Sequence, residues 1–288
     1  MSRRKVSVKS RFIHPLFPEG RTKAFTLSYD DGVTQDERLI AMFNKFKVKG
    51  TFNINSGLFG RKGQANGQPM PATHWRFPEE RIVNMYQGHE IAVHGAEHLD
   101  PVAYPLPVIA QDVLRDRVNL ENLLGHPVTG MAYPFGTYSE DIVALLKSLG
   151  IEYSRTVKST HSFDIPEDFL TWHPTCHHND PELIDLIQNF LNSNGHELKL
   201  FYLWGHAYEF DGHNNWGVIE NALSIISGYD DIWYATNGEI CRYIKAFDQL
   251  IFSADGHMVE NPTAMDLWIW VSKEAVKLPA GTVTTIGR

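Results

Sequence analysis

The segment Lys23–Gly32, KAFTLSYDDG, joins a short apolar run directly to two adjacent carboxylates and a glycine. The apolar run predicts a β-strand, and Val33–Phe46 after it has the pattern of a helix. A strand, an acidic turn and a helix together make a βα unit. Because α/β folds place functional groups at the carboxyl ends of parallel strands, we expect Asp30 and Asp31 to lie at an active edge. A plain turn with solvated carboxylates is the alternative.

Short apolar runs alternate with helical patterns along most of the chain. Further strands are expected at 50–54, 90–93, 128–133, 151–154, 198–204 and 231–234. Further helices are expected at 78–87, 108–124, 139–149, 181–191, 216–226 and 238–252. This order predicts a mainly parallel sheet of about seven or eight βα units. A length of 288 residues suits a single α/β barrel.

Two segments depart from this alternation. Residues 56–75 are rich in Gly, Pro and Asn and lack periodicity, which predicts a loop that is either a lid or binding wall, or a surface excursion without a role. After residue 255, the β-prone runs 267–271 and 282–286 predict the strands of a small β hairpin. The expected parts are therefore an N-terminal extension at 1–22, a main domain at 23–254 and a C-terminal β segment at 255–288.

The composition indicates which kinds of binding partner and which cellular compartment to expect. A net charge of −8 and a pI near 5.9 give no support for nucleic-acid binding, which usually requires a basic face. The basic residues within 1–21 are not followed by the apolar stretch of a signal peptide, and no window reaches the ~18 apolar residues of a membrane span. Cys176 and Cys241 are too few for a disulfide framework. We expect a cytoplasmic chain by default, with association with the bacterial cell envelope as the alternative.

A second polar motif, HEIAVHGAEH, carries His94 and His98 four residues apart, just after the strand expected at 90–93. If the chain turns helical there, both imidazoles face one side. Two neutral imidazoles and a carboxylate suit Zn²⁺ or a similar divalent ion, and such a set leaves coordination positions open, as in catalytic metal sites. In a chain with 14 histidines, this spacing alone is weak evidence for a metal site. The interpretation depends on combining the histidine pair with Asp30 and Asp31.

Three motifs in order resemble those of polysaccharide deacetylases with a NodB homology domain, carbohydrate esterase family 4. They are TLSYDDG at 26–32, HGAEH at 94–98 and AYPFG at 132–136. The resemblance covers about 23–252. It implies a distorted (β/α)7 barrel, to which the small β appendage would be added. It also implies a metal-dependent hydrolase that removes acetyl groups, above all N-acetyl groups, from a polysaccharide or oligosaccharide.

The resemblance further implies roles for single residues. Asp31, His94 and His98 correspond to the metal ligands, and Asp30 corresponds to the general base that takes a proton from metal-activated water. The metal is expected to be Zn²⁺, with Co²⁺, Ni²⁺ and Mn²⁺ as alternatives. The backbone N–H of Phe135 corresponds to the donor that stabilises the oxyanion.

The sequence departs from the family pattern in two places. Ala132 stands where many members have the arginine that orients the base, and Arg155 in the next strand is the candidate to replace it, with a surface arginine as the alternative. The strand FYLWGH places His206 as the general acid, slightly offset from the usual pattern. A carboxylate partner would keep this histidine protonated, and Asp168 loosely matches the segment that supplies it.

Aromatic side chains near the same strand ends are candidates to contact the sugar. Trp204, directly before the expected acid, is the first candidate, and Tyr133 and Trp172 complete the predicted substrate-binding set, with core packing as the alternative. The adjacent histidines in WHPTCHH, 172–178, are expected to line the cleft rather than to form a second zinc site.

Two other functions stay open at this point. Some NodB-like proteins open cyclic or linear C–N bonds, so a metal-dependent amidohydrolase acting on a small non-glycan amide is one alternative. A carbohydrate-binding relative with impaired catalysis is the other. The intact acidic and histidine motifs argue against the second alternative, whereas the missing motif arginine favours it. The number of subunits stays open.

Overall fold

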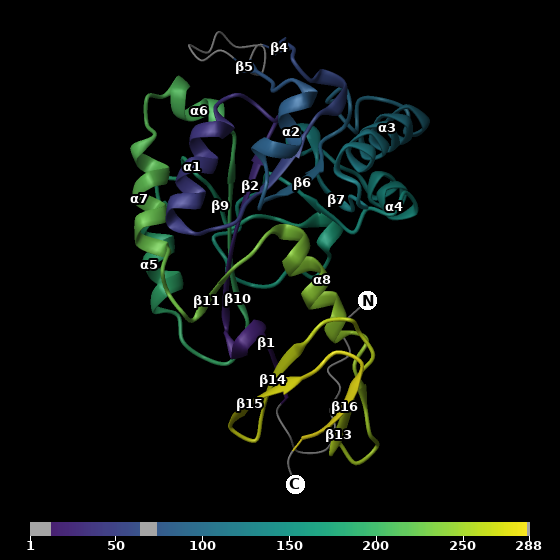
Figure 1. The fold of residues 1–288 in the computed structure, drawn as a ribbon, viewed down its shortest axis with the longest axis vertical. Helices are drawn as coiled ribbons and strands as arrows, with labels where there is room; N and C mark the ends of the chain where they lie inside the picture. The colour runs from purple at the N-terminus through teal and green to yellow at the C-terminus, as the bar shows by residue number, and fades with distance from the viewer. Residues whose placement is uncertain (1–12, 64–73, 287–288) are drawn as a thin grey trace.

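The computed structural model describes residues 13–63 and 74–286, so the first part of the predicted extension and the centre of the predicted loop lie outside it. Strand β2 (Lys23–Asp30) is buried along its whole length. It pairs in parallel with β3 (Thr51–Ile54) and β10 (Lys199–Gly205) (Figure 1). A strand covered on both faces reads as a nearly continuous apolar run, which is why this segment stood out in the sequence.

The main sheet extends from β2 in both directions, and all its pairings are parallel. Its remaining strands are β6 (Glu90–Val93), β7 (Gly130–Ala132), β8 (Tyr153–Arg155), β9 (Cys176–His177) and β11 (Ile232–Tyr234). The strand order is β8-β7-β6-β3-β2-β10-β9, and β11 pairs with the start of β2. The sheet curls, and the segment before β9 brings its edges together, because Trp172 bridges to Arg155 while Cys176 pairs with Leu203. The predicted distorted barrel is confirmed.

Helices follow the strands as the alternation predicted and cover the outside of the sheet (Figure 1). They are α1 (Asp36–Phe46), α2 (Glu79–Met85), α3 (Leu106–Leu124), α4 (Glu140–Ser148), α5 (Leu183–Asn192), α6 (Ala207–Gly212), α7 (Gly217–Ile226) and α8 (Asn237–Phe247). Helix α8 begins with a capping box between Thr236 and Glu239 and ends five residues earlier than predicted, since 251–252 form strand β12. Within the described part of the chain, no helix is both long and apolar enough to cross a membrane.

The C-terminal β segment is present, but its strands pair differently from the prediction. Strand β14 (Leu267–Val271) forms its hairpin with β15 (Glu274–Leu278), through a turn in which Ser272 and Lys273 both have positive φ. Strand β16 (Thr282–Thr285) instead pairs with β13 (Met258–Asn261). Strand β1 (His14–Leu16) joins β14, so part of the predicted extension belongs to this small sheet. Figure 1 shows the appendage at the opposite end of the molecule from β4 and β5.

The predicted loop at 56–75 contains short regular elements in its described part. A 3-10 turn covers Ser56–Leu58, and β4 (Lys62–Gly63) pairs in antiparallel with β5 (His74–Trp75). The two strands form the base of a hairpin whose centre, 64–73, lies outside the described residues.

Trp172 fills the interior behind the segment that closes the barrel. It is 1% exposed and contacts Tyr153, Phe169 and Tyr202 edge to face. We therefore expect Trp172→Ala to lower the free energy of unfolding by about 3–5 kcal/mol, measured by urea denaturation. Trp75→Ala is the matched control, because this tryptophan is 40% exposed. Equal stability of the two variants would contradict the packing described.

Candidate active site

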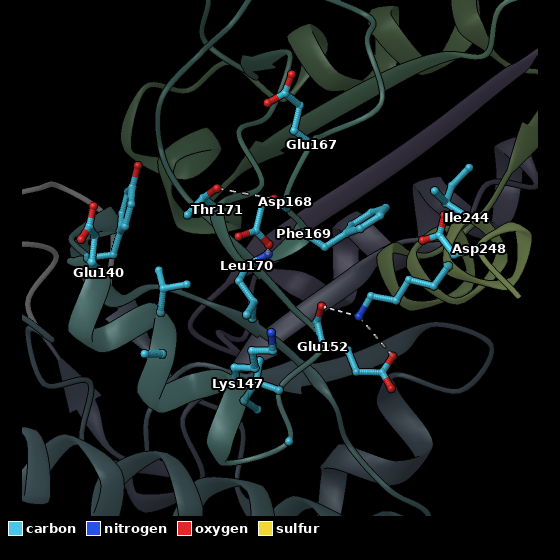
Figure 2. Close-up of a pocket in the computed structure, with 16 residues that line it drawn as sticks. Glu140, Lys147, Glu152, Glu167, Asp168, Phe169, Leu170, Thr171, Ile244 and Asp248 are labelled. Atoms are coloured by element: carbon cyan, nitrogen blue, oxygen red, sulfur yellow. Dashed lines mark hydrogen bonds and ion pairs between the residues drawn. The ribbon is translucent and has the colours of Figure 1, made fainter. Parts of the chain in front are cut away.

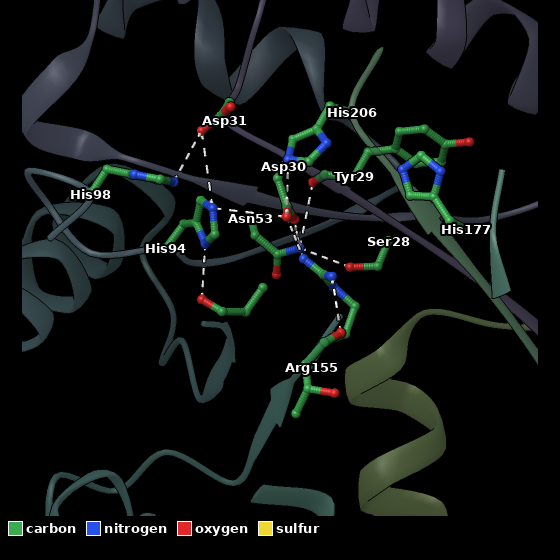
Figure 3. Close-up of polar contacts among 12 residues, drawn as sticks. Ser28, Tyr29, Asp30, Asp31, Asn53, His94, His98, Arg155, His177 and His206 are labelled. Carbon is green, nitrogen blue, oxygen red and sulfur yellow. Dashed lines mark hydrogen bonds and ion pairs between the residues drawn. The ribbon is translucent and has the colours of Figure 1, made fainter. Parts of the chain in front are cut away.

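The side chains predicted to form the site converge at the carboxyl ends of the strands (Figure 3). Asp30 is the last residue of β2, His94 and His98 follow β6, Arg155 ends β8, and His206 follows β10. Four separate strands therefore bring these groups to one place, as expected for a parallel α/β barrel.

Asp31, His94 and His98 form a compact set of donor atoms. The Oδ1 atom of Asp31 is 4.0 Å from Nε2 of His94 and 3.7 Å from Nε2 of His98. All three ligand atoms lie within 4.8 Å of one another. Nδ1 of His94 lies 2.9 Å from the Ala132 carbonyl oxygen, which can only accept, so the proton is on Nδ1 and the lone pair on Nε2 faces Asp31. This donor set fits a divalent ion.

The charge states of these groups also suit metal ligands. Burial lowers the pKa of His94, and burial together with His94 lowers the pKa of His98 to about 4, so both rings are neutral near pH 7. Burial alone would raise the pKa of Asp31, but the contact with His74, followed by His98 and Arg76, holds it well below its ordinary value. Metal ligands must be deprotonated in this way.

The backbone at the site is strained in three places. Asp31, His98 and Phe135 have φ values of 82°, 54° and 59°, in the left-handed region that L-residues rarely adopt. Such strain concentrates at functional sites, where a side chain or an N–H must be held in one direction. Gly32 also has a positive φ, and a Cβ there would lie 2.9 Å from the side chain of Ile54. The glycine after the two acids is therefore required by both conformation and space.

Asp30 is held by a buried cation and an amide. The guanidinium of Arg155, whose side chain is fully buried, donates to Oδ2 of Asp30, and Nδ2 of Asn53 donates to Oδ1 at 2.8 Å. The Nε2 atoms of His94 and His206 each lie 3.8 Å from Oδ2. Burial alone would raise the pKa of Asp30, but Arg155, with the two histidines, lowers it below its ordinary value. Arg155 thus lies beside the carboxylate that the missing motif arginine would orient.

The carboxylate beside His206 is Glu209, not Asp168. Oε1 of Glu209 lies 3.3 Å from Nδ1 of His206. Burial alone would lower the pKa of His206, but Glu209 raises it to about 9. Asp168 instead accepts a hydrogen bond of 2.8 Å from Leu170 N at the start of a 3-10 turn. The spacing of His206 and Glu209 at i and i+3, where β10 passes into α6, is a sequence signal that could have found this pair.

A second group of possible ligands surrounds the same glutamate. Oε2 of Glu209 lies 3.0 Å from Nε2 of both His177 and His178. Nδ1 of His177 accepts a hydrogen bond of 3.1 Å from Asn179 N, so in the neutral ring the proton is on Nε2, which then donates to Glu209. A protonated nitrogen has no lone pair for a metal, and the group therefore fits a hydrogen-bonded carboxylate better than a second metal site.

The predicted substrate-binding aromatics lie in the interior, which corrects that prediction. Tyr133 and Trp172 are each 1% exposed, and the Tyr133 hydroxyl donates to the Leu170 carbonyl oxygen at 2.8 Å. Trp204 is 8% exposed, and its ring lies 4.3 Å from the guanidinium of Arg155. These rings are taken up by core packing and by a cation–π contact, so they cannot present a face to a sugar.

The Phe135 side chain lies at the mouth of the site instead. It is 54% exposed, and its ring centroid is 4.7 Å from that of His98. From the sequence, only the backbone N–H of Phe135 was expected to act. The residue also has a positive φ, and its ring lies beside the candidate metal ligand His98.

A sizeable cavity lies away from these residues. It measures about 890 Å³ and is lined by α4, α8 and the turn that contains Asp168 (Figure 2). Lys245 donates to the Glu152 carbonyl oxygen across one side of it, at 2.9 Å. None of the candidate metal ligands lines this cavity, nor does Asp30 or His206, so its size does not locate the active site.

Comparison with known proteins agrees with the geometry. A family model described as polysaccharide deacetylase matches residues 18–154. No curated protein matches the chain. Among solved structures, the chain is similar to a candidate polysaccharide deacetylase from Mycobacterium smegmatis, with 19% identity and a TM-score of 0.56, over 82% of this chain and 94% of the other.

Two further structures share the fold. One is a candidate polysaccharide deacetylase from Pseudomonas aeruginosa PAO1, with 15% identity and a TM-score of 0.55, over 76% of this chain and 89% of the other. The other is Puue allantoinase, with 13% identity and a TM-score of 0.55, over 80% and 92%. At these identities the likeness shows the fold alone, while the family model carries the assignment. Residues 18–154 therefore match the polysaccharide deacetylase family, in agreement with the motifs of the sequence.

Proposed function

We propose that this chain is a metal-dependent hydrolase that removes acetyl groups, above all N-acetyl groups, from an acetylated glycan. The observation that carries the proposal is the placement of a two-histidine, one-carboxylate set directly beside the Asp30–Arg155 pair. The family match supports an acetylated glycan as the class of substrate.

Asp31, His94 and His98 would hold one divalent ion. Imidazole and carboxylate ligands suit Zn²⁺ first, with Co²⁺, Ni²⁺ and Mn²⁺ as alternatives. When bound, such an ion polarises the acyl carbonyl and makes water a stronger nucleophile at neutral pH.

Asp30 is assigned as the general base. It is ionised, it is separate from the three ligands, and it takes the proton of the attacking water. Arg155 and Asn53 hold its two oxygens in a fixed orientation. The N–H of Phe135, in its left-handed turn beside His98, would donate to the oxyanion that forms on the acyl carbon.

His206 is assigned as the general acid. Its Nδ1 faces Glu209 and its Nε2 faces the side of the site where Asp30 lies. A pKa of about 9 keeps the ring protonated at neutral pH, so Nε2 can give a proton to the departing amine nitrogen of the sugar. His177 and His178 hold Glu209 in place from its other oxygen.

Substitution of Glu209 tests this pairing through the pH profile. For the wild type, we expect kcat/KM to fall as pH rises through about 9, where His206 loses its proton. Glu209→Gln removes the negative charge that raises this pKa, so the basic limb should move to lower pH. Asp168→Asn is the matched control and should leave the limb where it is. A basic limb that moves in the Asp168 variant and not in the Glu209 variant would contradict the assignment.

A hydrolase acting on a small non-glycan amide is the second candidate. The burial of Tyr133, Trp172 and Trp204 favours it, because a polymer would gain from an exposed aromatic wall that these residues do not form. The two functions are separated by offering the zinc-loaded protein N-acetylglucosamine oligomers and, in parallel, small cyclic and linear amides. Acetate release from the oligomers alone supports the deacetylase, and turnover of the small amides alone supports the second candidate.

We also assign catalysis to the predicted main domain, 23–254. The candidate ligands, the base, the acid and their partners all lie between Ser28 and Glu209. The sheet formed by β1, β14 and β15 contributes none of them.

A further inference from the structure

Strand β5 lies directly against the turn that carries Asp31. Two backbone hydrogen bonds, of 2.7 and 3.0 Å, and one antiparallel bridge join residues 32–34 to residues 75–77. The hairpin base is therefore fixed to the end of β2. Because side chains alternate along an extended chain, His74 and Arg76 point to one side of it, and Trp75 points to the other.

Both inward side chains contact the carboxylate of Asp31, but on different oxygens. Nε2 of His74 lies 2.9 Å from Oδ2, and Nη2 of Arg76 lies 3.2 Å from Oδ1. An ionised carboxylate can only accept, so Nε2 of His74 carries the proton and donates it. Oδ1 is the oxygen that faces Nε2 of His98, at 3.7 Å.

We propose that His74 is a positioning residue that holds Oδ2 of Asp31, so that Oδ1 stays directed at His94 and His98. The inference rests on the proposed function in one respect, that Asp31 is a metal ligand. His74 lies in a segment that the three sequence motifs do not cover. The base of the hairpin would therefore help to orient a metal ligand.

The surroundings of His74 support a fixed orientation. Its ring is 4% exposed and packs edge to face on Tyr208, with centroids 4.8 Å apart. Among the described residues, His74 is the side chain in contact with Oδ2, whereas Arg76 shares Oδ1 with the two histidines. A hydrogen-bond donor on Oδ2 of Asp31 fixes the direction of Oδ1, the oxygen that would bind the metal. Loss of such a partner typically lowers metal affinity about 10–100-fold.

The test uses Co²⁺ as the probe, because its visible absorption reports both binding and coordination geometry. His74→Phe keeps a ring against Tyr208 and removes the N–H. His74→Gln keeps an amide N–H at a similar reach. We expect His74→Phe to weaken Co²⁺ binding about 10–100-fold, in competition with a chelator, and to change the absorption spectrum, while His74→Gln stays close to the wild type.

His161→Phe is the matched control. It removes a contact of the same kind, Nε2 to Oδ2 of Asp180 at 2.7 Å, from an exposed histidine away from the candidate ligands. If His74→Phe does not fold by circular dichroism, His74→Asn takes its place, since its shorter amide no longer reaches Oδ2.

The outcomes separate this inference from the proposed function. Wild-type affinity and spectrum in the folded variant that lacks the donor would overturn the positioning role alone. Co²⁺ binding that is unaffected by His94→Ala would show that the ligand set itself is wrong. A rescue by His74→Gln, together with loss in His74→Phe, supports the hydrogen bond rather than the shape of the ring.

Discussion

Asp30→Asn should keep its divalent metal and lose about 10²- to 10⁴-fold in kcat, because the amide keeps the size of the carboxylate but cannot take a proton. The structure gives a clear reason to expect this separation. Asp30 is bonded to Arg155 and Asn53, whereas its neighbour Asp31 faces the two histidines of the donor set. The measurement is turnover of an acetylated oligosaccharide, with metal content determined on the same sample.

Asp31→Asn is the natural comparison for Asp30→Asn. The two positions are adjacent and both are buried, so a general effect of removing a carboxylate would appear in both variants. We expect the Asp31 variant to lose metal as well as turnover. Equal metal loss in the two variants would mean that the division between base and ligand is wrong.

His94→Ala and His98→Ala should each reduce bound metal from one ion per chain to a small fraction, and activity with it. Each removes one of the two imidazole donors, and the remaining carboxylate and single ring make a weak site. Atomic absorption after gel filtration measures the stoichiometry. His126→Ala is the control, since this histidine is exposed and its Nδ1 lies 3.1 Å from the carbonyl oxygen of the neighbouring Pro127. Full stoichiometry in both ligand variants would place the metal elsewhere.

The same site should respond to pH. In the metal-free chain the pKa of His98 is about 4, so protons begin to compete with the metal as pH falls towards that value. Metal affinity should therefore be nearly constant around neutral pH and drop in the acid range.

The order of strands and helices was predictable because most strands of the barrel are buried on both faces. Strand β6 falls at Glu90–Val93, as its apolar run indicated, and β2 differs from its prediction only in where the turn begins. The acids, the histidine pair and Arg155 were predicted as site residues for a related reason. They follow the carboxyl ends of such runs, where parallel sheets carry their functional side chains.

The direction of side chains at those strand ends was not predictable. Strands β7 and β8 have three residues each, too few to show an alternation, so the sequence could not tell which side of the wall Tyr133 faces. Trp204 lies in β10, where nearly every residue is buried, so the sequence again does not show which side of the sheet its ring faces. The rings of Tyr133, Trp172 and Trp204 lie near the site in the fold, but they face the interior.

Pairings between distant segments were also beyond the sequence. The predicted hairpin partner of β14 was 282–286, because TVTTI is a β-prone run, whereas the observed partner β15, EAVKL, carries two charged residues. His74 lies in a segment without periodicity, and its contact with Asp31 spans 43 positions. Long-range contacts of this kind follow from the assembled fold rather than from local preference.

The central claim is that one metal held by Asp31, His94 and His98 makes this chain a deacetylase. Titration of the metal-stripped protein with Zn²⁺, while acetate release from an N-acetylglucosamine oligomer is followed, tests it most directly. Activity should be near zero without metal, rise in proportion to added Zn²⁺ and level off at about one equivalent per chain, in the wild type and not in His94→Ala. Acetate release that is the same before and after metal is added, or that is equal in His94→Ala, would contradict the claim.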